Sequence, residues 1–184
     1  MSDELHFESA VELARRLRER EVSAVEVADA FLRRIDSENP RINAFTTVTH
    51  DLALKTARRC DEAAAVGRSL GILHGVPVAI KDLFDFRAGV RSTFGSLPLK
   101  DFVPNETTLY VQRHEDAGAV IVGKTNAPAF GHKQTGSQPS YTATTGTAEM
   151  STNTHPANGT AGGPRTCTSV THRCQYGGSS AVLG

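Results

Sequence analysis

The sequence predicts an α/β fold whose sheet contains at least one pair of parallel strands. Two short apolar runs, residues 76–80 and 117–123, are rich in β-branched residues and bounded by glycine, as buried strands are. The residues between them, 105–117, have the pattern of a helix, with Asn105 as the expected N-cap. A strand, a helix and a second strand in this order are typical of a crossover unit, here residues 75–123.

A helical front, residues 8–66, precedes this unit. Ser9 and Glu12 have the spacing of a capping box, in which each side chain satisfies the backbone N–H of the other residue. Ser23 and Glu26 repeat the pattern, and each pair is followed by apolar residues at helical spacing.

Two further signals divide this front. Pro40 is expected to end the second helix, because proline restricts the residue before it to extended geometry. A third helix is expected over residues 51–65, ending near Gly67.

Residues 134–184 differ in character from the first 133. They are rich in Thr, Ser, Gly and Pro, and from Gly131 to Ser169 there is no Leu, Ile, Val or Phe. Such a segment buries little apolar surface to offset its loss of conformational entropy, so it is expected to form a loop or to be disordered. The change has two explanations that stay open: a truncated chain, or a reading-frame disruption after about Lys133.

Charge and composition exclude several classes of protein. The 20 basic and 20 acidic residues cancel, so nothing indicates direct nucleic-acid binding. The apolar runs are far shorter than the ~20 residues that a membrane helix needs. The odd cysteine count gives no disulfide framework, which favours the reducing cytoplasm.

No cofactor or metal is expected. Neither of the common glycine-rich phosphate-binding motifs is present. Cys167, His172 and Cys174 form a C-x4-H-x-C pattern, but a zinc site usually needs four ligands in paired spacing.

The strongest candidate for a catalytic residue is Lys81, within "HGVPVAIKDLFD". It ends an apolar run, and Asp82 and Asp85 follow it. A lysine there ordinarily reaches solvent or pairs with a nearby acid. Alternatively, an apolar wall can lower the pKa of a lysine by up to ~3–5 units, which makes the amine a usable proton acceptor. Lys124 also follows a predicted strand; a surface position is expected for it, and a second site lysine is the alternative.

Several motifs in order resemble the front of the amidase signature family. They are "SAVEVADAFLRRIDSENPRINAF", "GILHGVPVAIKDLFDFRAGVRSTFGS" and "AGAVIVGKTNAPAFGHK". The family includes amidases and the A subunit of glutaminyl- and asparaginyl-tRNA amidotransferases. The resemblance implies an α/β/α fold with a mixed sheet, of which this chain carries the N-terminal portion over residues 1–133.

The resemblance also implies a Ser–cis-Ser–Lys relay that cleaves amide bonds. Lys81 matches the catalytic lysine, which takes a proton from a bridging serine, which in turn deprotonates the nucleophilic serine. Ser179 in "YGGSSAVLG" is the match for the bridging serine, although "GTAGG" at residues 159–163 competes for the same alignment. The nucleophile's "GTD-x-GGS" motif does not occur in the chain.

Three functions therefore remain open. The chain is an amidase acting on a small-molecule amide, or the A subunit of a tRNA-dependent amidotransferase with partner subunits, or a non-catalytic fragment or binding module. Because the nucleophile motif is missing, the 184-residue polypeptide is expected to be inactive alone.

Overall fold

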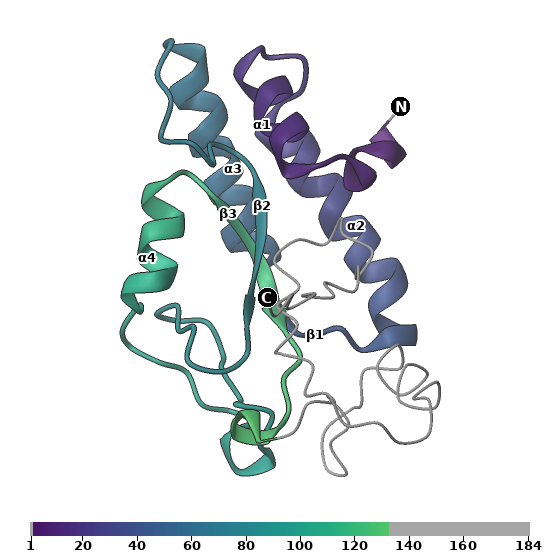
Figure 1. Ribbon diagram of the computed structural model, residues 1–184, viewed down its shortest axis with the longest axis vertical. Helices are drawn as coiled ribbons and strands as arrows, with labels where there is room; N and C mark the ends of the chain where they lie inside the picture. The colour runs from purple at the N-terminus through teal and green to yellow at the C-terminus, as the bar shows by residue number, and fades with distance from the viewer. Residues whose placement is uncertain (1, 133–184) are drawn as a thin grey trace, which may run out of the picture.

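A three-stranded mixed sheet lies at the centre of the computed structural model, which describes residues 2–132 (Figure 1). The strand order is β1–β3–β2, with β2 parallel and β1 antiparallel to β3. The strands are β1 Phe45–Val48, β2 Pro77–Lys81 and β3 Val120–Thr125. The α/β class, the mixed sheet and the parallel pair formed by β2 and β3 are thereby confirmed.

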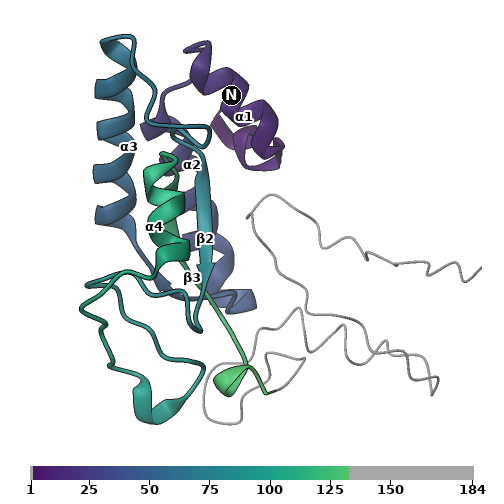
Figure 2. The same ribbon diagram turned by 60° about the vertical axis from the view of Figure 1, so that its left-hand side comes forward.

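Helices cover both faces of the sheet. They are α1 Ala10–Arg18, α2 Ala24–Ile42, α3 His50–Ala65 and α4 Leu109–Asp116, with short 3-10 helices at Ser2–Phe7, Leu97–Leu99 and Ala129–Gly131. The buried residues of α3 group with Ala79 and Val122, whereas Val111 of α4 groups with Ile80 and Ile121, so the two helices pack on different faces of the sheet. Figure 2 shows α4 beside β2. Within residues 2–132, no helix combines the length and the apolar character needed to cross a membrane.

Two groups of buried side chains follow from this layering. Val76, Ala79, Val120 and Val122 belong to the main core, which includes the buried faces of α1, α2 and α3. On the other face of the sheet, a smaller group consists of Ile80, Ile121 and Val111, and Val111 is the buried residue of α4. Alternation along β2 therefore sends successive side chains to different layers.

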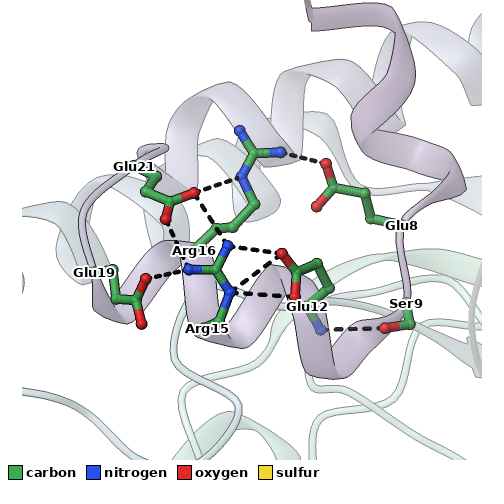
Figure 3. Close-up of polar contacts among 7 residues, drawn as sticks. All are labelled: Glu8, Ser9, Glu12, Arg15, Arg16, Glu19 and Glu21. Atoms are coloured by element: carbon green, nitrogen blue, oxygen red, sulfur yellow. Dashed lines mark hydrogen bonds and ion pairs between the residues drawn. The ribbon is translucent and has the colours of Figure 1, made fainter.

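The N-terminal helix α1 has half of its predicted capping box. The Ser9 hydroxyl accepts the Glu12 N–H at 3.2 Å, as expected. The Glu12 carboxylate instead pairs with Arg15, at 2.7 Å, within a network that also joins Glu21 (Figure 3). This hydrogen bond from Arg15 lowers the pKa of Glu12. The reciprocal half of the box was predicted wrongly because an arginine one turn away competes for the carboxylate.

Helix α2 has the complete box. Ser23 accepts the Glu26 N–H at 3.1 Å, and the Glu26 carboxylate accepts the Ser23 N–H at 2.9 Å. The prediction that Pro40 ends this helix is wrong, since α2 continues to Ile42. In the last turn a proline removes one backbone hydrogen bond, and Asn43 closes the helix in the left-handed conformation.

Two other boundaries differ from the sequence predictions. Helix α4 begins after Thr108 rather than at Asn105. The Thr107 hydroxyl accepts the Ala88 N–H and the Thr108 N–H bonds to Phe86 O, so these residues are bound to the preceding loop instead of a first helical turn. Strand β1 was not predicted, although "FTTV" is the β-branched and aromatic composition typical of strands.

One glycine is required by the packing of the loop that follows β2. Gly95 has φ +63°, and a Cβ there would lie 2.1 Å from the backbone oxygen of Ala127. The loop can therefore approach the chain beyond β3 this closely only with glycine at position 95.

Candidate active site

The parallel pairing of β2 and β3 brings two lysines to the same end of the sheet. Lys81 is the last residue of β2, and Lys124 lies near the end of β3, where it pairs with Ile80 in the ladder. Lys81 itself pairs with Thr125. The two lysines therefore occupy neighbouring rungs and, by the alternation of side chains, opposite faces of the sheet.

Asp82 is the centre of a buried polar cluster at this end of the sheet. Its carboxylate accepts the Thr93 N–H at 2.8 Å, the Thr93 hydroxyl, and the Thr46 hydroxyl at 3.1 Å. The Lys124 ammonium lies 3.5 Å from the same carboxylate, and both side chains are fully buried. The cluster thus joins β1, the end of β2, β3 and the loop that follows β2.

Lys124 is enclosed by this cluster. Its ammonium also donates to the Ser92 hydroxyl and lies 5.7 Å from the centre of the Phe86 ring. Burial lowers the pKa of Lys124, and the nearby Asp82 carboxylate opposes that shift. The expectation of a surface position for Lys124 is wrong.

Lys81 has a different environment. Its side chain is partly buried, and among residues 2–132 its ammonium has no hydrogen bond and no ion pair. The neighbouring acids are bound elsewhere: Asp82 to the cluster, and Asp85 to the backbone N–H of Lys81 at 3.2 Å. The ordinary interpretation of Lys81 as the partner of one of these acids therefore does not hold.

Burial also decides which lysine a substrate could reach. Lys124 and Ser92 form a lysine–hydroxyl pair of the kind that general-base chemistry needs, but both residues are 0% exposed. Lys81 is partly exposed and has no hydroxyl partner within the described part of the chain. Its role as the base remains a prediction.

The other predicted site residues lie outside the described residues. These are Ser179 and the pattern Cys167, His172 and Cys174. Over residues 2–132, His, Cys, Asp and Glu side chains form no group that could hold a metal ion.

Sequence reasoning missed the cluster around Asp82. Asp82 was interpreted only as a partner for Lys81, and Ser92, Thr93 and Thr46 were not singled out. A usable signal was present, because parallel pairing of the two predicted strands places their terminal lysines side by side.

Two surface hollows lie away from Lys81, beside the turn between α1 and α2. Their volumes are about 140 and 370 Å³, and both are lined by Leu17, Arg20, Ala64 and His74. Neither contains a residue of the lysine end of the sheet.

Comparison with known proteins decides the family. The model of the family described as Amidase matches residues 26–163. The chain belongs to the amidase family. Over 127 residues this amidase-family chain is 45% identical to the A subunit of the glutamyl-tRNA(Gln) amidotransferase of Carboxydothermus hydrogenoformans, covering 69% of the chain and 26% of that relative. The protein of the same name from Acidothermus cellulolyticus is 47% identical over 130 residues, which cover 71% of the chain and 25% of the relative.

Solved amidase structures share the fold. A bacterial aryl acylamidase of the amidase signature family has a TM-score of 0.67 and 28% identity, over 71% of this chain and 27% of that chain. The peptide amidase of Stenotrophomonas maltophilia has a TM-score of 0.62 and 34% identity, over 66% and 25%. The chain therefore spans about a quarter of the length of the relatives it matches.

Proposed function

We propose that Lys81 is the terminal base of a Ser–cis-Ser–Lys relay that cleaves amide bonds, within an amidase domain of which this chain carries the front portion. The observation that supports this role most directly is the environment of Lys81 at the end of β2. The residue is partly exposed, the Asp82 carboxylate is bound within the buried cluster, and the Asp85 carboxylate accepts the backbone N–H of Lys81 and forms no ion pair with its ammonium. A lysine can accept a proton only when it is neutral, and a carboxylate partner would favour its charged form.

The proposed relay needs two serines in addition to Lys81. The amine takes a proton from a bridging serine, for which Ser179 is the candidate. That serine takes the proton of the nucleophilic serine, whose oxygen attacks the amide carbonyl and forms an acyl-enzyme as the amine leaves. Water or ammonia then releases the acyl group. We assign no nucleophile within the 184 residues.

The names of the relatives favour a second candidate for the complete protein. The two curated relatives described above are amidotransferase subunits with 45% and 47% identity, whereas the two solved amidases have 28% and 34%. We therefore include the A subunit of a tRNA-dependent amidotransferase, which would release ammonia from glutamine and work with partner subunits in the cytoplasm. If the complete protein is instead an amidase that works without partner subunits, its substrate would be a small-molecule amide other than glutamine.

A chimera tests the role of Lys81. The matched 127-residue segment of the Carboxydothermus hydrogenoformans protein is replaced by that of this chain, and glutamine hydrolysis is measured with and without the partner subunits. Lys81→Ala should lower kcat by roughly 10²–10⁴-fold, the usual contribution of a general base. Lys55→Ala, on α3, is the matched control and should leave kcat unchanged. Activity of the Lys81→Ala chimera equal to that of its parent would refute the proposal.

The 184-residue polypeptide by itself tests the alternative that the chain is a non-catalytic fragment or binding module. A fluorophosphonate probe reacts with activated serines, so the 184-residue chain should remain unlabelled if it carries no working nucleophile. Labelling that disappears in Lys81→Ala would instead show that this polypeptide is itself an active amidase.

A further inference from the structure

We propose that the buried Asp82–Lys124 pair is a positioning device for Lys81: it fixes the end of β2 and holds the Asp82 carboxylate away from the Lys81 ammonium. This role rests on the proposed function of Lys81 as the base. The pair is 0% exposed and does not touch a substrate, so Asp82 and Lys124 are positioning residues and not catalytic residues.

The first part of this role is mechanical. Asp82 adjoins Lys81, and its carboxylate is bonded to the backbone N–H and the hydroxyl of Thr93 and to the hydroxyl of Thr46. These partners belong to the loop after β2 and to β1. The residue after Lys81 is therefore tied to two other segments as well as to Lys124.

The peptide groups on both sides of Lys81 are also held by hydrogen bonds of their own. The N–H of Lys81 donates to the Asp85 carboxylate at 3.2 Å, and the N–H of Asp82 donates to Thr125 O at 2.9 Å. With both peptide planes held, the direction in which the Lys81 side chain leaves the strand is set. The long lysine stem loses rotamer entropy when it is ordered, so a fixed starting direction leaves fewer rotatable bonds to be ordered near a substrate.

The second part of the role is electrostatic. Asp82 is the charged group closest in sequence to Lys81, and an ion pair between them would occupy the Lys81 ammonium. Successive side chains of a strand point to opposite faces, so Asp82 lies on the face of Lys124 and Ile80. There Lys124 supplies the balancing charge at 3.5 Å and three hydrogen bonds occupy the carboxylate. Lys81 is left without a carboxylate partner within the described residues.

The test removes the pair without leaving a buried charge. Removing one member alone would leave the other uncompensated, which destabilises a fold strongly, whereas replacing both with neutral groups is often tolerated. The variant is therefore Asp82→Asn/Lys124→Met in the 184-residue chain. A matched control is Arg87→Gln/Glu115→Gln, which removes another ion pair, 3.1 Å long, between the loop and α4.

The readout is the ¹H–¹³C signal of each lysine ε-methylene at one fixed pH. The lysines of the chain are Lys55, Lys81, Lys100, Lys124 and Lys133. In the parent chain we expect a Lys81 signal distinct from those of the exposed Lys55 and Lys100. In Asp82→Asn/Lys124→Met it should collapse onto them, with the circular dichroism spectrum retained, and in the control variant it should not move.

Two results would overturn the proposal. One is a Lys81 signal that already coincides with the exposed lysines in the parent chain. The other is a Lys81 signal that stays in place after the pair is removed, since the pair would then serve folding alone. If Asp82→Asn/Lys124→Met loses its folded structure, Ser92→Ala is measured as well. This variant keeps the Asp82–Lys124 pair and removes only the Ser92 hydroxyl that binds the Lys124 ammonium, so the Lys81 signal should remain distinct.

Kinetics of the chimera separate this proposal from the proposed function. Asp82→Asn/Lys124→Met should lower kcat by about 100-fold, the scale expected for a misplaced reacting group, with KM nearly unchanged. If Lys81→Ala has no effect on kcat, the proposed function fails. If Lys81→Ala abolishes activity but the double variant keeps full kcat, only the positioning role fails.

Discussion

At the scale of single residues, Lys81 and Lys124 show how two similar sequence positions acquire different environments. Both follow a β-branched run, and their strands are adjacent and parallel. Lys124 is 0% exposed and paired with Asp82, whereas Lys81 is partly accessible. The sequence predicted that Lys81 ends a strand, and its role as a base stays a prediction. The sequence could not show which lysine the acid contacts, because that depends on a ladder whose register shifts between Val78 and Ala79.

The burial of Lys124 leads to a prediction for how the free energy of unfolding depends on pH. Its ordinary pKa of 10.5 is lowered in the fold, chiefly by burial. Between the lowered value and 10.5 the unfolded chain binds more protons at this residue than the folded chain does. The contribution of Lys124 to the free energy of unfolding should therefore rise with pH across that window.

Urea unfolding of the parent and of Asp82→Asn/Lys124→Met at a series of alkaline pH values measures this contribution. The difference between their unfolding free energies should change in favour of the parent as the pH approaches 10.5. A difference that is independent of pH would show that Lys124 has an ordinary pKa in the folded chain.

At the scale of the elements, the two N-terminal capping patterns can be compared directly. The same Ser-x-x-Glu spacing gives a complete box at Ser23 and Glu26, but a half box at Ser9 and Glu12. The spacing predicted both helix starts. It could not predict the second bond at Glu12, because Arg15 and its network on α1 attract that carboxylate (Figure 3).

Ser23→Ala should therefore cost more stability than Ser9→Ala. Loss of an N-cap serine costs about 1 kcal/mol, and at Ser23 the reciprocal bond to Glu26 is weakened as well. At Ser9 the Glu12 carboxylate keeps its arginine partner. Thermal unfolding of the two variants followed by circular dichroism gives the comparison, and a larger loss for Ser9→Ala would contradict it.

A second prediction at this scale concerns two glycines in the loop after β2, Gly89 and Gly95. Gly95→Ala would place a Cβ 2.1 Å from Ala127 O, in a backbone conformation with positive φ. Gly89 also has positive φ, +76°, but no atom lies within 4 Å of its added Cβ. Gly89→Ala should cost about 1–2 kcal/mol for the backbone conformation alone.

Gly95→Ala should cost clearly more than Gly89→Ala, because its clash is with backbone that has to move. Urea unfolding midpoints of both variants measure the difference. Equal midpoints would mean that the loop relaxes freely around Gly95.

At the scale of the whole molecule, the sequence predicted more of the fold than of the site. The crossover unit and the helical front follow from local patterns of apolar residues. Strand β1 was missed because it has four residues and is held by pairing with β3, which is distant in sequence. The cluster at Asp82 was missed for the same reason, since its members come from segments that only the sheet brings together.

The described part of the chain also exposes large apolar side chains near the lysine end of the sheet. Phe84, Phe94 and Phe130 form a group in which Phe84 is 66% and Phe130 48% exposed. Leu97 and Val103, in the same loop region, are 48% and 52% exposed. Apolar surface that is gathered in this way commonly marks a site of further contact.

The isolated 184-residue polypeptide should therefore be only weakly stable. We expect a thermal transition below the ~45–65 °C range of mesophilic domains, together with binding of an apolar dye such as ANS. A cooperative transition within that range, without dye binding, would contradict this expectation.

The hydrogen bond between Asp85 and the backbone of Lys81 has a consequence for self-association. The N–H of Asp82 donates to β3, so by alternation the backbone groups of Pro77, Ala79 and Lys81 face the open side of β2. Pro77 has no N–H to offer. The N–H of Lys81 is already bound to Asp85. In the described sheet, Ala79 is thus the one residue of β2 with a donor to offer an incoming strand, which disfavours edge-to-edge aggregation.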